Sequence, residues 1–243
     1  MSASESSFLM SRRAFQRRSA VLLTGLLGAA WERAQALGLA DLSNADASSG
    51  VKAALEKGAN VALDLLGRPG GFLDNPKVRI PLPGGMDQAA QLMRSFGQGQ
   101  KVDELVTAMN RAAEAAVPMG KEILLAAVHG MTVSDAKGIL TGGAHSVTDF
   151  FASKTREPLG QKFLPIVTQA TEKVSLAQRY NDFAGRASRF GLVKSEDADL
   201  SRYVTGKTLD GLYQVIGEEE QKIRQDPMGA GSDILQKVFG AVH

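Results

Sequence analysis

The sequence contains no cysteine, and this absence removes several classes of protein at once. Without a thiol the chain forms no disulfide, no thiolate metal site, no covalent haem attachment and no lipid-modified cysteine anchor. Histidine is also scarce, with only His129, His145 and His243 in the chain. Because a transition-metal site needs three or four ligands of defined type, this composition predicts no metal site and no cofactor.

The chain also lacks an apolar run of about 20 residues, which is the length that spans a bilayer. Its most signal-like stretch runs from Ser19 to Trp31, after a basic region and before Ala34 and Ala36. A basic region, a short apolar core and a small-residue cleavage site, in this order, are typical of a secretory signal peptide. The sequence therefore predicts a signal over residues 1–36, with cleavage after Ala36.

The basic region contains Arg12 and Arg13 after a serine, with Phe15 two residues later. This pattern resembles a twin-arginine signal, although Gln16 replaces the leucine usually found next. The resemblance implies a periplasmic protein, with the twin-arginine translocase as its partner during export and no stable membrane anchor in the mature form. An amphipathic first helix of the domain is disfavoured, because the leucines here surround the helix axis instead of forming one stripe.

The excess of basic residues belongs to this predicted signal. The whole chain has 28 Lys and Arg against 26 Asp and Glu, but residues 1–36 hold five arginines and two glutamates. Residues 37–243 therefore carry 23 basic and 24 acidic side chains. This balance gives no support for nucleic acid or an anionic membrane as a partner.

Helical spacing of apolar residues dominates residues 37–243, which are long enough for one domain with a real core. The pattern predicts an all-α, bundle-like single domain. Helices are expected over 43–66, 86–96, 101–116, 118–129, 134–140, 199–224 and 232–239. The segment 145–190 is alanine-rich and continuous except for Pro158 and Pro165. We expect Ser134 and Asp199 to cap the helices that begin there, and Pro165 to end or kink the helix that contains it.

Residues 67–85 interrupt the helical pattern with four prolines and five glycines, so a helix cannot cross them. Charged and β-branched residues alternate from Lys77 to Ile80, which predicts a short strand or hairpin, or an extended segment lying on the helices. Because a lone strand leaves its backbone groups unpaired, either a partner strand or burial of Phe72, Val78 and Ile80 is required.

The helix expected at 101–116 contains the polar group Asn110, Arg111 and Glu114. Arg111 and Glu114 are three residues apart and are expected to pair on the surface. Asn110 lies near the apolar edge of the helix, and we expect it to be buried and to fix the 72–83 segment through hydrogen bonds to its backbone. This structural role is favoured over contact with a ligand.

No catalytic motif emerges from the sequence. Ser134 and Lys137 have the S-x-x-K spacing of penicillin-interacting enzymes, but the accompanying S-D-N and K-T-G motifs are absent. The charged stretch 218–224 is expected to be a solvated helix face. An enzyme is therefore the least favoured function, although acidic pairs from distant positions could still converge in the fold.

The segment from Gly71 to Pro83 resembles the signature stretch of a family of exported bacterial proteins, domain-of-unknown-function family 4197. Further matches lie at 109–114, 131–142, 203–205, 209–211 and 219–240. The resemblance covers nearly all of residues 42–240 and implies a helical, signal-bearing protein of Gram-negative bacteria with no established reaction. Some relatives carry a lipid-modified cysteine, which this chain lacks, so membrane anchoring does not carry over.

Two non-catalytic functions remain open. The first is an interaction or scaffold module of the cell envelope that docks a partner protein through the 67–85 segment or the last helix. The candidate docking residues of that segment are Phe72, Asn75, Lys77, Val78, Arg79 and Ile80. The second is a protein that binds a small apolar ligand or lipid, because the helices are rich in methionine, a flexible residue that suits adaptable apolar pockets. The sequence slightly favours the first.

Replacing Arg12 and Arg13 by lysine tests the predicted export route. A helical domain rich in local contacts folds quickly, so the double variant is expected to accumulate as folded precursor in the cytoplasm. Cell fractionation followed by immunoblotting measures the distribution. Unchanged export of the double variant would indicate a general secretory signal instead of a twin-arginine signal.

Overall fold

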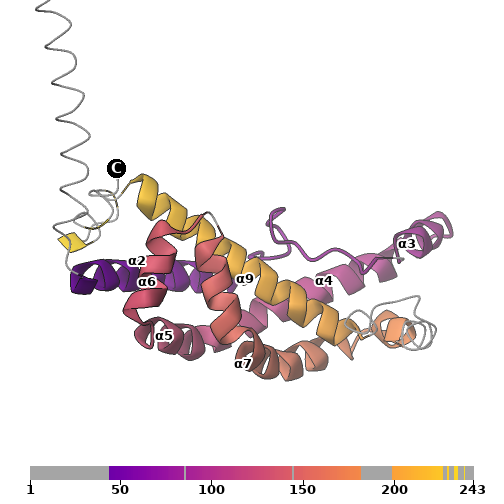
Figure 1. Ribbon diagram of the computed structural model, residues 1–243. Helices are drawn as coiled ribbons and strands as arrows, with labels where there is room; N and C mark the ends of the chain where they lie inside the picture. The colour runs from indigo at the N-terminus through magenta and orange to yellow at the C-terminus, as the bar shows by residue number, and fades with distance from the viewer. Residues whose placement is uncertain are drawn as a thin grey trace, which may run out of the picture.

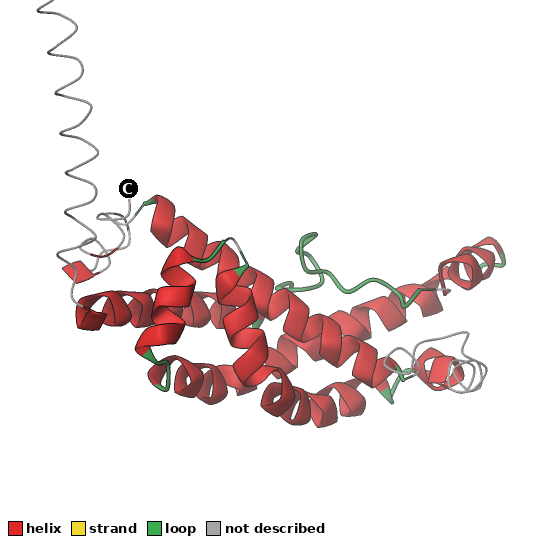
Figure 2. Ribbon diagram, in the orientation of Figure 1, coloured by secondary structure: helices red, strands yellow, loops and turns green. Residues whose placement is uncertain are grey.

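The computed structural model describes residues 44–84, 86–143, 145–181, 199–226, 229, 233–234 and 238. Within these ranges seven α-helices pack in a single bundle and no strand is present (Figure 2). The predicted all-α fold is therefore confirmed. The predicted signal, residues 1–36, and most of the predicted last helix, 232–239, lie outside the described residues.

The helices are α2 (Asn44–Leu66), α3 (Met86–Ser95), α4 (Gly99–Ala116), α5 (Lys121–His129), α6 (Val133–Thr141), α7 (Ser146–Thr171) and α9 (Leu200–Gln225), with the 3-10 turn η1 (Val117–Gly120) between α4 and α5. Helix α9 lies across α2 and α7, and α4 packs on α7 (Figure 1). Their buried faces form a main apolar core around side chains such as Leu55, Phe151 and Tyr213, and Ala54, Ile223 and Val238 form a smaller cluster beside it. No single described helix has the length and apolar character to cross a membrane, although 99–129 and 133–141, bent by 99°, have both when taken together.

Capping explains where α9 and α6 begin. Asp199 caps α9 as expected, since its Oδ1 accepts a hydrogen bond from the backbone N–H of Arg202 at 2.9 Å. The cap expected at Ser134 is wrong. Thr132 Oγ1 instead accepts from the Asp135 N–H at 3.1 Å, and Asp135 Oδ2 accepts from the Thr132 N–H at 3.0 Å. This reciprocal capping box pairs two otherwise free donors, so α6 begins one residue earlier than expected.

Helix α7 runs through Pro158 and Pro165, so it does not end at Pro165. Each proline removes one backbone donor inside the helix. The loss is offset by burial of Phe151, Leu159 and Phe163 on the face that packs in the core. Tertiary packing therefore keeps α7 helical through two prolines that would interrupt an isolated helix.

Residues 67–84 follow the bundle as a series of turns and extended backbone, drawn in green in Figure 2. No strand or hairpin forms in this described stretch, and the docked alternative is confirmed. Phe72, Val78 and Ile80 are 0%, 7% and 1% exposed. Gly70 has a φ of 85°, in the left-handed region that favours glycine, and this turn returns the chain toward the bundle after α2.

Gly211 on α9 marks a close approach between this segment and the bundle. A Cβ atom at Gly211 would lie 3.0 Å from Cε1 of Phe72 and 3.2 Å from Cβ of Val78. Gly206 on the same helix differs, because a Cβ atom there would meet nothing within 4 Å. Of these two glycines, Gly211 is therefore the one that the segment requires in order to pack on α9.

Replacing Gly211 by valine forces the Phe72 and Val78 side chains away from α9. We expect the free energy of unfolding to fall by about 1–3 kcal/mol, the usual cost of overpacking. Gly206→Ala is the matched control, because alanine is favoured over glycine inside a helix by about 1 kcal/mol and meets no neighbour at this position. Urea unfolding measures both variants, and equal stabilities would contradict the close packing.

Candidate functional site

Asn110 on α4 holds one end of the 67–84 segment and is fully buried. Its Oδ1 accepts a hydrogen bond from the Ile80 N–H at 2.8 Å, and its Nδ2 donates to the Ile80 carbonyl at 3.0 Å. The same Nδ2 also donates to the Val106 carbonyl at 2.8 Å. Asn110 thus pairs both backbone groups of a residue that is buried outside any helix or strand, as the sequence predicts.

Glu114, one helical turn further along α4, holds the other end of the segment. Its Oε1 accepts hydrogen bonds from the N–H groups of Phe72 at 3.1 Å and Leu73 at 3.0 Å. Its Oε2 accepts from the Arg111 guanidinium at 2.6 Å. The pair with Arg111 is present, but its expected surface position is wrong for Glu114, which is only 4% exposed. The carboxylate is buried because the segment uses it as a backbone acceptor.

The surroundings of Glu114 act on its pKa in opposite directions. Burial raises the pKa, but hydrogen bonds from Leu73, Arg111, Phe72 and Gly70 together outweigh it, so the pKa lies below its ordinary value. A carboxylate whose pKa is lowered by folding stabilises the folded protein at pH values above the pKa that the same group has in the unfolded chain. That contribution is lost as the pH falls through the folded-state pKa.

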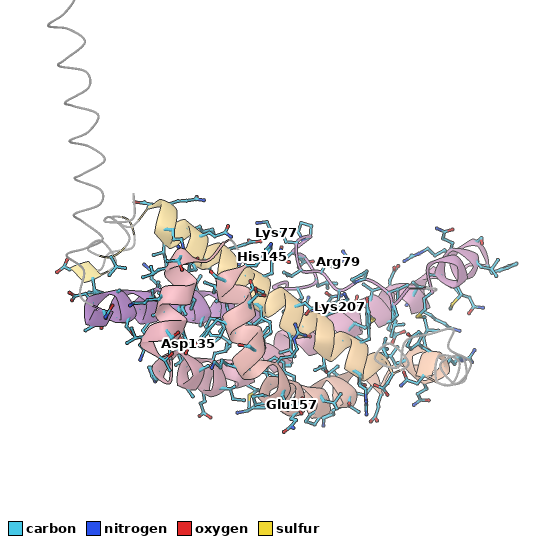
Figure 3. The ribbon with its side chains drawn as sticks, in the orientation of Figure 1. Lys77, Arg79, Asp135, His145, Glu157 and Lys207 are labelled. Carbon is cyan, nitrogen blue, oxygen red and sulfur yellow. The ribbon has the colours of Figure 1, made fainter. Side chains whose placement is uncertain are left out.

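Lys77 and Arg79 are exposed on the segment (Figure 3), as are Arg68 and the acidic Asp74. Lys77 Nζ lies 2.8 Å from Glu218 Oε2 on α9, and this hydrogen-bonded ion pair lowers the pKa of Glu218. Arg79 forms no ion pair within 4.0 Å in the described part of the chain, but its charge acts on Asp103 of α4, whose pKa is lowered by a hydrogen bond from Arg94 and also by Arg79. Asn75 is half-buried, and its Oδ1 accepts a hydrogen bond from the Lys77 N–H at 3.2 Å. Of the six candidate docking residues, Lys77 and Arg79 are therefore the exposed ones.

Helix α9 adds a third cation beside the segment. The Tyr203 hydroxyl donates a hydrogen bond to the Pro81 carbonyl at 3.2 Å, and Lys207 Nζ lies 5.8 Å from the centroid of the Tyr203 ring. This cation–π contact places Lys207 near Pro81 without neutralising its charge. Lys77, Arg79 and Lys207 are together called the cationic edge below.

The stretch 218–224 is not a fully solvated face, so that prediction is wrong for Glu220 and Arg224. Glu220 is 3% exposed and is hydrogen-bonded to Arg224. Arg224 also donates to the carbonyls of Ile139 at 2.7 Å and Leu140 at 3.3 Å. Burial raises the pKa of Glu220, and Arg224 opposes the rise. The pair connects α9 to the last turn of α6, a long-range contact that helical periodicity does not reveal.

The other chemical candidates lie apart from one another. Among the described residues, no three metal-binding side chains gather at one place. His129 ends α5, with its Nε2 2.9 Å from Glu56 Oε1, while His145 directly precedes α7. Ser134 lies exposed on α6. The arrangement built from the sequence candidates is therefore an anchored segment with a cationic edge.

The variant Asn110→Ala tests the first anchor. It leaves the buried N–H and carbonyl of Ile80 without partners, and we expect the free energy of unfolding to fall by about 3 kcal/mol. Asn60→Ala is the control, since Asn60 Nδ2 donates only to the Glu56 carbonyl within α2. The control is expected to cost less than about 1 kcal/mol in the same urea titration. Similar losses in both variants would contradict the anchoring role.

The variant Glu114→Gln tests the second anchor through its pH dependence. Because the pKa of Glu114 is lowered, the unmodified protein should be more stable than the variant near neutral pH. The difference should shrink as the pH falls through the folded-state pKa, where Glu114 itself becomes neutral. Urea unfolding of both proteins from about pH 7 to about pH 3 measures this difference. A difference that does not change with pH would contradict the account.

Comparison with known families gives one result for this chain. Residues 41–240 match the family model described as a protein of unknown function (DUF4197). No curated protein and no solved structure matches the chain. The matched range contains both anchors and the whole cationic edge. Because the match covers most of the sequence, the chain belongs to the DUF4197 family of proteins of unknown function.

Proposed function

We propose that this protein is exported to the periplasm and acts there as a non-catalytic interaction module of the cell envelope. Export is supported by the order of the N-terminal residues, with Arg12 and Arg13 before an apolar stretch and Ala34 and Ala36 after it. The interaction role is carried by one observation, which is that two cations of the cationic edge, Lys77 and Arg79, lie on a segment fixed on both sides by buried anchors, with Lys207 of α9 beside it.

The anchors support docking because they fix where the charges lie. Asn110 and Glu114 pair the backbone at Ile80 and Phe72, so the exposed residues between them are held on a rigid scaffold. Binding residues are often found on loops that a rigid scaffold positions. A fixed loop also loses little conformational entropy when a partner binds, which favours affinity.

The charges favour an acidic protein surface as the partner. Arg79 and Lys207 make no ion pair with described residues, whereas Lys77 shares its charge with Glu218. An arginine presents its donors in a planar fork that matches a carboxylate. Since residues 37–243 are close to neutral as a whole, a local positive edge selects partners by local charge complementarity.

The methionines give less support to the apolar-ligand alternative. Met109 and Met131 are 0% and 5% exposed and belong to the main core. Met119 is 50% exposed on η1. Two of these methionines fill the core and the third lies on the surface. The abundance of methionine therefore does not by itself indicate an apolar pocket.

A photo-crosslinking amino acid at Gln214 tests the proposed docking. Gln214 is exposed on α9 beside the segment, and its replacement leaves the three cations intact. In the native host we expect one discrete adduct from this position and none from the same probe at Ser134 on α6. Adding Arg79→Glu and Lys207→Glu should lower the adduct yield by about tenfold or more, because like charges then face the partner.

Charge reversal elsewhere provides the matched control. Lys137 and Lys154 are exposed on α6 and α7, and replacing both by glutamate changes the net charge equally. This double variant should retain the adduct at position 214. The absence of any adduct, or an equal yield in the two double variants, would contradict docking through the cationic edge.

A further inference from the structure

Helix α3 lies at one end of the molecule, where it packs on α4, and it exposes two neighbouring apolar side chains (Figure 1). Phe96, directly after the last residue of α3, is 74% exposed, and Leu92 is 59% exposed. The Phe96 N–H donates to the Leu92 carbonyl at 3.1 Å, so the two side chains are one helical turn apart on the same side of the helix. The other exposed large apolar residues of the described chain lie singly on α2, η1 and α6, and they are Val61, Met119 and Val133. Leu92 and Phe96 are called the apolar tip below.

The turn that joins α3 to α4 fixes the backbone of the apolar tip. The Gly97 N–H donates to the Arg94 carbonyl at 3.1 Å. The Gln98 N–H donates to the Met93 carbonyl at 2.8 Å, and these are the two hydrogen bonds of a Schellman motif. Gly97 has a φ of 74°, the left-handed conformation that this motif requires. Arg94 also pairs with Asp103 of α4 at 2.6 Å, so a fixed hairpin presents the apolar tip.

The apolar tip is continuous with the cationic edge. Asp103, which holds Arg94 of α3, also feels the charge of Arg79 in the edge. Met86, the first residue of α3, packs against the main core and follows Arg79 by only seven residues, so the start of α3 is fixed beside the edge. A helix of this length extends about 15 Å. The tip and the edge therefore fit within one interface of standard size, which covers about 800 Å² on each partner.

We propose that the apolar tip enters an apolar pocket on the same acidic protein that docks on the cationic edge. This inference rests on the proposed docking function and adds the second half of the partner's chemistry, an apolar pocket with carboxylates beside it. Aromatic side chains buried in a partner's pocket supply much of the binding energy of protein interfaces, whereas surrounding charges steer the encounter. Phe96 supplies the first contribution and the cationic edge supplies the second.

A lipid surface is the less favoured occupant of the apolar tip. Helices that lie on membranes carry several basic residues on their polar face. Arg94 is the only basic residue of α3, and its charge is already paired with Asp103. The sequence and the ion pair therefore favour a protein pocket.

A second photo-crosslinking position tests whether the partner is shared. Gln91 is exposed on α3 directly before Leu92. In the native host we expect the probe at Gln91 to capture the same protein as the probe at Gln214, identified by mass spectrometry of the two adducts. Different proteins at the two positions, or no adduct at Gln91, would overturn the inference and leave docking at the cationic edge standing.

Replacing Leu92 and Phe96 by serine removes the apolar tip without changing any charge. Both side chains are exposed, so the Tm should be retained, while the adduct yield at Gln214 should fall by about tenfold or more. Met119→Ser with Val133→Ser is the matched control, because it removes two exposed apolar side chains from other elements and should leave the yield unchanged. Equal yields in the two double variants would overturn the inference.

Vesicles of phosphatidylethanolamine and phosphatidylglycerol test the lipid alternative. Co-sedimentation is expected to recover no more of the unmodified protein than of the variant with serine at positions 92 and 96. Vesicle binding that this variant loses would overturn the inference in favour of a membrane surface. An unchanged yield at Gln214 after Arg79→Glu and Lys207→Glu would instead contradict the docking function itself, so the two failures are distinguishable.

Discussion

A backbone that is buried outside regular secondary structure must have its peptide groups paired, and this constraint decides the chemistry of α4. Phe72 and Ile80 of the 67–84 segment are buried in the core, so their backbone N–H groups are buried as well. Glu114 and Asn110 supply the acceptors. Without them the burial of these apolar side chains would leave unpaired donors, at about 1–3 kcal/mol each. Two polar side chains therefore make the apolar packing possible.

Helix α9 also holds the 67–84 segment in place. Gly211 allows the segment to pack closely on α9, and the Tyr203 hydroxyl donates a hydrogen bond to the Pro81 carbonyl. The same helix presents Lys207 beside the segment. The cationic edge thus depends on a helix whose core face is buried along its length. A change in the position of α9 would therefore alter the cationic edge.

The sequence predicts the features that depend on local spacing and misses those that depend on distant packing. Apolar periodicity located the helices, and the position of Asn110 at an apolar edge predicted its bonds to the segment. The sequence left open whether Pro165 ends or kinks its helix, and α7 continues through it because core burial compensates for the lost donor. The burial of Glu220 was missed because its surroundings include carbonyls of α6.

Hydrogen exchange at the amides of Phe72, Leu73 and Ile80 tests most directly whether the segment is anchored. These amides are donors to Glu114 and Asn110, whereas residues in an unanchored loop exchange quickly. The account predicts protection comparable with that of α4 core amides such as Ala112. Exchange at the rate of solvent-exposed loop amides would contradict it.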